Sequence, residues 1–294
     1  MVSLPHLDFD SAVADSQLAD LWRENGVLVF DGFWDAETVS RVRARAVQLR
    51  AVCAEEAPDA VFDAEDQAHA TDAWFCTSGE TIRAFFEPAA AENVDRTHRV
   101  NKLGHALHDL DPLFSRVLRD PRLAVLLARL GVQEPLLVQS MVIFKEPGIG
   151  AAVPAHQDAT FLRTSPPSVV GLWFALDAAT ADNGALEVCV GAHSTAIRAE
   201  FVRTDAGLSL RTVDDRPLPS EGYVSVQASP GTLVVFHGSL PHRSAHNHGQ
   251  QPRFAVTLHV VDGVCTWCPD NWLVRQTPFS GFEQNAGLEG GSGK

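Results

Sequence analysis

The chain has 294 residues, of which 45% are hydrophobic and 20% are charged, and its formal net charge at pH 7 is −14. This composition is typical of a globular protein, and the acidic balance without a basic patch argues against nucleic-acid binding. No apolar run reaches the roughly 18 residues that would predict a transmembrane helix. The N-terminus has neither the basic nor the apolar region of a secretory signal, so we expect a cytoplasmic protein without a membrane partner.

The first third of the chain is predicted to be mainly helical, with one strand. Residues 26–30 form a short apolar run bounded by Gly and Asp, which indicates a strand. Asp35 is placed to cap a helix with apolar residues at helical spacing, and Asp120, followed by a proline, starts a second helix that ends at Gly131. Residues 54–72 are acidic, rich in alanine and weakly patterned, and we interpret them as a mobile excursion.

From residue 134 onward the pattern changes to short strands separated by Gly, Pro, Asn and Asp. Several short strands without long helices between them favour a sandwich or a barrel. We therefore expect a single domain over residues 1–280, with a helical part to about residue 133, a β-rich core over about 134–275, and a Gly-rich disordered tail over 281–294. The predicted strands span residues 136–144, 169–176, 185–190, 231–236 and 254–260.

One long segment, residues 196–223, interrupts these strands. Long connections in compact domains are often lids or binding loops, so we expect this segment to border a site. The five cysteines are expected to be free thiols because their number is odd and no signal peptide precedes them. Cys265 and Cys268 have a CxxC spacing, but a structural zinc site needs a second pair or two histidines. We interpret them as ordinary buried or half-buried residues.

His156, Gln157 and Asp158 form the triplet that carries the most chemical information. Alternate residues of an extended strand share a face, so the imidazole of His156 and the carboxylate of Asp158 can point to one side. A nitrogen ligand from a distant strand, such as His242, would complete a 2-His-1-carboxylate triad, which suits non-haem Fe(II). Twelve histidines make chance pairs common, however, and five of them lie between residues 237 and 259. Surface or capping histidines therefore remain an alternative on this pattern alone.

The surrounding segments resemble the phytanoyl-CoA dioxygenase family. The resemblance covers roughly residues 20–275 and includes the segment PAHQDATFL, which is similar to the first-ligand motif of the family. Residues 183–186, followed by Gly-Ala-His, resemble an NGxL…PGSH signature, with valine in place of proline and alanine in place of serine. The offsets of the second-histidine motif are matched by Gly231, His242, Ser244, Asn247 and Arg253.

The resemblance implies a mostly β fold with flanking α-helices, a double-stranded β-helix (jelly roll, cupin-like). It implies Fe(II), 2-oxoglutarate as cosubstrate and O2, with His156, Asp158 and His242 as metal ligands. An arginine is suited to the distal carboxylate of 2-oxoglutarate because it is planar and bidentate. A lysine among apolar neighbours, such as Lys102, needs an anionic partner if it is buried. By resemblance, the cosubstrate contacts are Lys102, Met141, Trp173, Ser244 and Arg253.

The predicted function is oxidation of a small-molecule substrate coupled to conversion of 2-oxoglutarate to succinate. Asp158 fills the position that related halogenases leave to a halide, so hydroxylation or a related oxidation is expected. Two alternatives remain: a non-catalytic jelly roll that binds metal and 2-oxoglutarate, and a hydrolase or isomerase with Zn²⁺ or Mn²⁺. No Lys/Arg cluster suits the phosphates of a CoA thioester, although Arg198, Arg203 and Arg211 could meet one anionic group. The sequence does not specify an oligomeric state.

Overall fold

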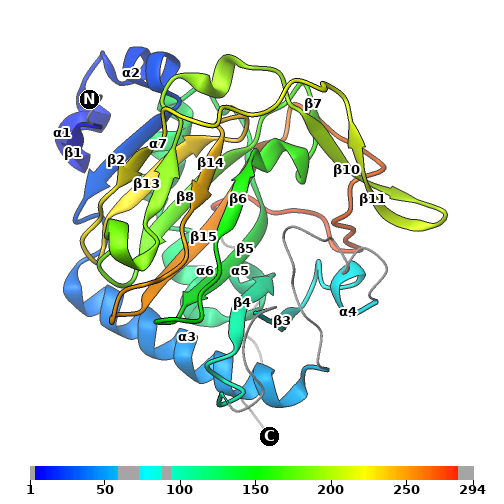
Figure 1. Cartoon of the computed structure of the whole chain (residues 1–294). Helices are drawn as coiled ribbons and strands as arrows, with labels where there is room; N and C mark the ends of the chain where they lie inside the picture. The colour runs from blue at the N-terminus through cyan, green and yellow to red at the C-terminus, as the bar shows by residue number, and fades with distance from the viewer. Residues whose placement is uncertain (1–3, 59–72, 88–93, 284–294) are drawn as a thin grey trace, which may run out of the picture.

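The computed structural model describes residues 4–58, 73–87 and 94–283. Its largest element, here called the major sheet, has eight strands in the order β1-β2-β13-β8-β15-β5-β4-β3 (Figure 1). Neighbouring strands are antiparallel except for β1 and β2, which are parallel. The strands are β1 (His6–Asp8), β2 (Val27–Asp31), β3 (Ile82–Phe86), β4 (Val100–His105), β5 (Pro135–Lys145), β8 (Val170–Ala175), β13 (Leu233–His237) and β15 (Arg253–Asp262).

A second sheet, here called the minor sheet, has four strands in the order β12-β9-β14-β6. They are β6 (Val153–His156), β9 (Leu186–Val188), β12 (Val224–Val226) and β14 (His242–Ser244). From β5 onward the chain passes repeatedly between the sheets: β5, β8, β13 and β15 lie in the major sheet, and β6, β9, β12 and β14 in the minor sheet. One apolar cluster joins Trp173 and Val234 of the major sheet to Val188 and Val226 of the minor sheet, so the two sheets pack in a jelly-roll type arrangement.

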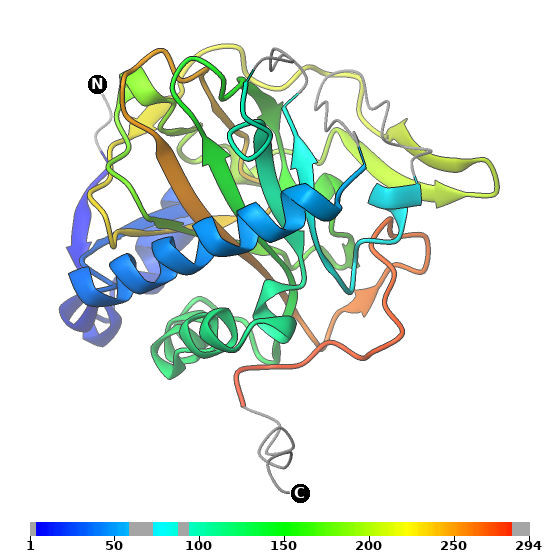
Figure 2. The same ribbon diagram turned by 90° about the horizontal axis from the view of Figure 1, so that it is seen from below.

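Helices cover the outer face of the major sheet, where α3 runs across the strands (Figure 2). Asp35 caps α3 by accepting a hydrogen bond from the Thr38 N–H at 2.8 Å, and Asp120 caps α7 through the Arg122 N–H at 2.9 Å, as predicted. The helices are α1 (Phe9–Ala14), α2 (Leu18–Asn25), α3 (Ala36–Glu56), α4 (Ala73–Cys76), α5 (Leu107–Leu110), α6 (Pro112–Leu118) and α7 (Pro121–Arg129). A large apolar core fills the space between these helices and the sheet.

The expectation of one strand in the first third is wrong, because β1, β2, β3 and β4 all belong to the major sheet. β4 escaped detection because Lys102 and His105, which line the cavity, interrupt its apolar run. Each of the five strands predicted after residue 134 is present. Most of the expected excursion (residues 59–72) and nearly all of the expected tail (residues 284–294) lie outside the described residues.

The segment 196–223 contains a hairpin of β10 (Ala199–Thr204) and β11 (Gly207–Thr212). A short pair of strands, β7 (Thr164–Ser165) and β16 (Thr266–Trp267), lies near it. Cys265 and Cys268 flank β16; both are free and partly buried, in agreement with the prediction. Within the described ranges, none of the helices has the length and apolarity needed to cross a bilayer.

Candidate active site

Three predicted metal ligands converge where the minor sheet meets the following turn. His156 ends β6 and His242 opens β14, and the two residues are direct partners across these strands. β6 ends at His156, Gln157 keeps an extended backbone, and Asp158 opens the 3₁₀ turn η2 (Asp158–Thr160), so only the first residue of the triplet lies in the strand. Asp158 Oδ1 lies 3.8 Å from His156 Nε2 and 3.6 Å from His242 Nε2. Among the described residues, this is the one group of at least three His, Cys, Asp or Glu side chains that could hold a metal ion.

Both histidine rings are oriented in the same way by the backbone. His156 Nδ1 lies 2.9 Å from the Pro154 carbonyl oxygen, and His242 Nδ1 lies 3.0 Å from that of Leu240. Because a carbonyl only accepts, each Nδ1 carries the proton, which leaves the Nε2 lone pair for a metal. Burial lowers the pKa of His156 to about 4, so the ring is neutral. Neutral, pre-oriented imidazoles are what a divalent metal site requires.

The carboxylate of Asp158 is held by a third histidine. His259 Nε2–H donates to Asp158 Oδ2 at 3.1 Å, which leaves Oδ1 for the metal. Burial alone would raise the pKa of Asp158, but the rings of His259 and His242 hold it below its ordinary value. Gly171 lies directly behind this carboxylate, where a Cβ atom would come within 3.0 Å of Oδ2. Sequence reasoning did not single out His259; the available signal was its even spacing from Arg253 along one strand.

Gln157, the middle residue of the triplet, connects the candidate metal ligands to the segment 196–223 by hydrogen bonds. Its Nε2 donates to the Ser239 carbonyl oxygen at 2.8 Å, and its Oε1 accepts from the Arg198 N–H at 3.1 Å. The side chain is 1% exposed, so these bonds are shielded from water. The triplet is therefore fixed from both sides, which favours a rigid metal geometry.

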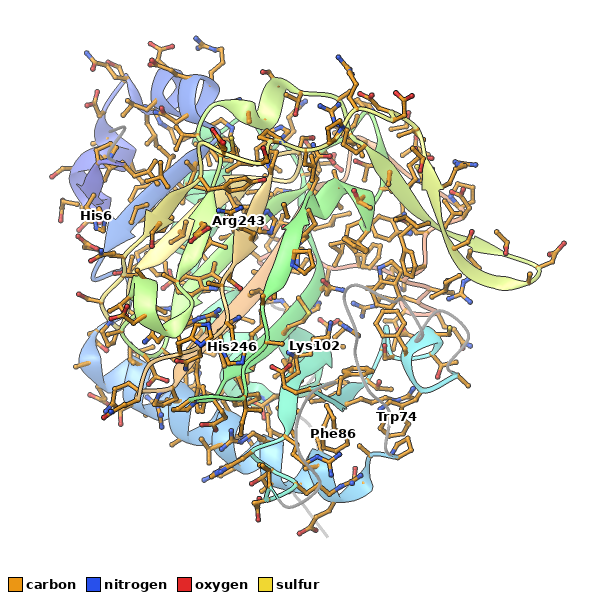
Figure 3. All side chains as sticks on the ribbon, viewed as in Figure 1. His6, Trp74, Phe86, Lys102, Arg243 and His246 are labelled. Atoms are coloured by element: carbon orange, nitrogen blue, oxygen red, sulfur yellow. The ribbon has the colours of Figure 1, made fainter. Side chains whose placement is uncertain are left out.

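A cavity of about 360 Å³ opens beside the triad, between the two sheets. Figure 3 labels Lys102, which lies on β4 at the wall of this cavity. The segment 196–223 borders it through Phe201, Leu210 and Leu218, where we expected a lid or binding loop. Every predicted site residue lines the cavity: Lys102, Met141, His156, Asp158, Trp173, His242, Ser244 and Arg253. The structure thus brings all of the predicted residues together.

Arg253 is a buried cation at one end of the cavity. Its side chain is 3% exposed, and its Nε–H donates to the Gly184 carbonyl oxygen at 3.0 Å. Burial lowers the pKa of Arg253 to about 10, so the guanidinium remains charged at neutral pH. No carboxylate in the described part of the chain lies within 4.0 Å of it. Because a buried cation without an anion is costly, this end of the cavity suits a carboxylate ligand.

Two further charged residues at this end were missed by the sequence reasoning. Lys145 lies opposite Arg253 in the register of β5 and β15. Its Nζ donates to the Ala151 and Ala245 carbonyl oxygens at 2.5 and 2.8 Å. Glu87 is buried, and its Oε1 accepts from Asn101 Nδ2 at 2.8 Å. Burial lowers the pKa of Lys102 to about 7, whereas Glu87 raises it. Three basic side chains and one carboxylate thus line this end of the cavity, and the excess of basic groups supports binding of an anion.

The cavity lining includes several aromatic side chains, and the segment 196–223 offers it no unoccupied arginine. Arg198 pairs with Asp214, and Arg211 pairs with Glu200. The Arg203 guanidinium donates to the backbone carbonyl oxygens of Cys76 and Trp272 at 3.1 and 2.6 Å. All three arginines considered for an anionic substrate group therefore already have protein partners. Aromatic side chains of the lining include Phe75, Phe161, Phe201 and Trp272.

Residues 22–255 match the family described as Phytanoyl-CoA dioxygenase (PhyH). The chain belongs to this family. It is 37% identical over 268 residues to "Phytanoyl-CoA dioxygenase" from Arabidopsis thaliana, covering 87% of this chain and 92% of the relative. It is 35% identical over 292 residues to "Phytanoyl-CoA dioxygenase domain-containing protein 1" from Bos taurus, covering 91% and 97%. The family resemblance predicted from the sequence is confirmed.

Solved structures share the fold of this phytanoyl-CoA dioxygenase family member. The non-heme alpha ketoglutarate dependent carbocyclase SnoK from nogalamycin biosynthesis superposes with a TM-score of 0.63 at 16% identity, over 90% of each chain. The apoform of EctD from S. alaskensis gives a TM-score of 0.62 at 20% identity, over 90% of this chain and 83% of EctD. These likenesses confirm the sheet-rich, jelly-roll type fold.

Motif residues of the family that do not face the cavity shape the turns around it. Gly184 adopts φ +76°, and a Cβ atom there would come within 2.4 Å of the Ala245 carbonyl oxygen. Its own carbonyl oxygen accepts from Arg253, so the close approach positions the buried cation. Asn247 Nδ2 donates to the Lys145 and Gln251 carbonyl oxygens at 2.8 and 2.9 Å. Both motifs therefore support the anion-binding end of the site.

Proposed function

We propose that the chain is an Fe(II)- and 2-oxoglutarate-dependent dioxygenase that hydroxylates, or otherwise oxidises, a small-molecule substrate. The observation that carries this proposal is the presence, in one cavity, of the His156–Asp158–His242 group and a buried Arg253 without a carboxylate partner among the described residues. Structural neighbours support it: one is the epimerase SnoN in complex with Fe3+ and alpha ketoglutarate, and another is EctD with bound Fe. We assign the alternation of strands between the two sheets to a double-stranded β-helix.

The residues present fit the proposed metal. Two neutral imidazole Nε2 atoms and one carboxylate oxygen would hold Fe(II) and leave positions for 2-oxoglutarate and O2. When bound, these groups would supply the oxidising power that replaces a hydrogen of the substrate by a hydroxyl group, while 2-oxoglutarate becomes succinate and CO2. Asp158 is present as a ligand, so no position is vacated for a halide and hydroxylation is favoured over halogenation.

The protein's own contribution is to orient the cosubstrate and exclude water. Arg253 would receive the distal carboxylate of 2-oxoglutarate in a bidentate pair, and the Ser244 hydroxyl lies on the same cavity wall. Lys102 adds a second basic group, and Met141 and Trp173 provide apolar walls. In a cavity screened from water, such charge-assisted hydrogen bonds are stronger than at the surface. These five residues are therefore proposed as the cosubstrate-binding set.

The substrate is proposed to be a small molecule rather than a CoA thioester. A CoA thioester carries several phosphate charges, which need arginine or lysine partners. Arg198, Arg203 and Arg211 of the segment 196–223 are already engaged by Asp214, backbone carbonyl oxygens and Glu200. The name of the family therefore does not specify the substrate of this chain.

Succinate formation tests the proposal against both alternatives. The chain, loaded anaerobically with Fe(II) and 2-oxoglutarate and then exposed to air with a substrate panel, should produce succinate. Asp158→Ala should produce none while keeping the melting temperature of the metal-free chain within a few degrees. Binding of Fe(II) and 2-oxoglutarate without succinate from any substrate would favour the non-catalytic module. An activity that survives Arg253→Ala unchanged would favour a Zn²⁺ or Mn²⁺ hydrolase or isomerase.

A further inference from the structure

His105 is a cavity residue that the metal site and the anion-binding end do not use. It ends β4, is 1% exposed and lines the cavity. Three aromatic rings surround it: Phe75, Phe85 and Trp272 have centroids 5.7, 5.4 and 5.1 Å from that of the imidazole. A polar ring held in an apolar wall needs a hydrogen-bond partner for each nitrogen, because an unpaired buried nitrogen is costly.

Ser78 determines which nitrogen of His105 carries the proton. Its Oγ lies 2.6 Å from the Phe75 carbonyl oxygen and 2.8 Å from His105 Nδ1. The hydroxyl has one proton and the carbonyl only accepts, so Ser78 donates to the carbonyl and accepts from Nδ1–H. Burial lowers the pKa of His105 well below its ordinary value, so the ring is neutral. Nε2 therefore carries a lone pair and is a hydrogen-bond acceptor.

This acceptor is open to the cavity. Within the described residues, His105 Nε2 has no hydrogen-bond partner. It differs from His259 Nδ1, which also lacks a partner but is fully buried, because His105 Nε2 keeps some exposed surface. Gln139 lies on the adjacent strand β5, one residue from Ser140, the partner of His105, and lines the same cavity. Its amide likewise is neither sealed nor hydrogen-bonded within the described ranges. An acceptor and an amide thus lie together on a largely aromatic wall.

We propose that His105 Nε2 accepts a hydrogen bond from a hydroxyl or N–H group of the substrate, with the Gln139 amide as a second polar contact. The inference rests on the proposed function, in that the molecule held here is the one oxidised. It assigns the substrate to the class of neutral, largely apolar molecules that carry a hydrogen-bond donor. A ligand of the same shape without the donor would leave Nε2 desolvated and unpaired, which should weaken binding about tenfold or more.

Indole and benzofuran are suitable probes because they have the same shape and differ in one N–H donor. Their dissociation constants are to be measured by ligand-observed NMR on the full chain, first without added metal and then with Mn²⁺ and 2-oxoglutarate. Wild type should bind indole about tenfold more tightly than benzofuran in both states. His105→Phe keeps an aromatic ring in the wall but removes the acceptor, so the two probes should bind it equally. Ser78→Ala removes the oxygen that accepts from His105 Nδ1–H, so either ring nitrogen can carry the proton and the preference for indole should fall. This second variant keeps the test decisive if His105→Phe does not fold.

Three results would overturn the proposal: equal affinity of the two probes for wild type, no binding of either probe, or a preference for indole that survives in both variants. The probe experiment does not depend on turnover. Loss of succinate formation with the indole preference intact would therefore refute the proposed dioxygenase function alone. Succinate formation without an indole preference would refute the role of His105 alone.

Discussion

Replacing His259 by leucine tests whether the carboxylate ligand depends on a partner outside the metal triad. The hydrogen bond from His259 to the charged carboxylate of Asp158 is 3.1 Å long, and His259 is only 5% exposed. A buried hydrogen bond to a charged group contributes about 1.5–3 kcal/mol, which corresponds to roughly 10–100-fold in an equilibrium constant. Without it, Oδ2 is free to compete for the metal or to turn the carboxylate away. We therefore expect His259→Leu to weaken Mn²⁺ binding about 10–100-fold.

The assay is a titration with Mn²⁺, in which the free ion is followed by electron paramagnetic resonance. His259→Gln is the matched variant, because its Nε2–H can still donate to Asp158 and should retain most of the affinity. His248→Leu, at an exposed histidine, controls for the loss of an imidazole. The reasoning is refuted if folded His259→Leu binds Mn²⁺ within about twofold of wild type, since the bond would then contribute nothing to the metal site.

Arg253→Lys should raise the 2-oxoglutarate concentration needed for half-saturation about 10–100-fold, because a bidentate pair becomes a single contact; an unchanged requirement would remove Arg253 from the cosubstrate site. Gly171→Ala should weaken metal binding, because the new Cβ would lie 2.6 Å from the Phe236 ring and 3.0 Å from Asp158 Oδ2 and would displace both side chains; metal affinity equal to that of wild type would contradict this. Burial lowers the pKa of His108 to about 3 in the folded chain, from an ordinary value of 6.5. Below pH 6.5 the unfolded chain therefore binds a proton at this histidine that the folded chain does not, and the folded chain loses stability as the pH falls. His108→Gln should therefore recover about 2 kcal/mol of the loss between pH 7 and pH 5 in urea denaturation, and parallel pH profiles would refute the assignment. Leu210→Ser, at an exposed hairpin residue that lines the cavity, should change substrate preference but not Mn²⁺ affinity; unchanged selectivity would separate the hairpin from the substrate.

The convergence of His156, Asp158, His242 and Arg253 on one cavity could be predicted from the sequence because each residue lies in a local motif. The motif keeps the residue types and their offsets together, and the turns that it encodes, such as the one at Gly184, place the side chains. His242 could not have been selected by composition, since four other histidines lie near it in sequence. The surrounding motif identified His242 among them, and the register of β14 with β6, which places His242 opposite His156, agrees with this selection.

Residues that act across strands could not be predicted in the same way. Lys145 meets Arg253 only through the pairing of β5 with β15, and His259 reaches Asp158 from a strand about a hundred residues later in the chain. Local spacing does not encode either contact; the even spacing of His259 from Arg253 indicates only that the two side chains share a face of β15. β4 was missed for a related reason: it carries polar residues that line the cavity, so its pattern departs from that of an apolar strand.

The most direct test of the central claim is the absorption spectrum of the anaerobic chain with Fe(II), before and after addition of 2-oxoglutarate. A 2-oxo acid chelated to Fe(II) produces a visible charge-transfer band, and the account predicts such a band in wild type at one equivalent of iron. The band should be absent in Asp158→Ala and should require more 2-oxoglutarate in Arg253→Lys. A wild-type chain that binds Fe(II) but shows no band at any 2-oxoglutarate concentration would contradict the account.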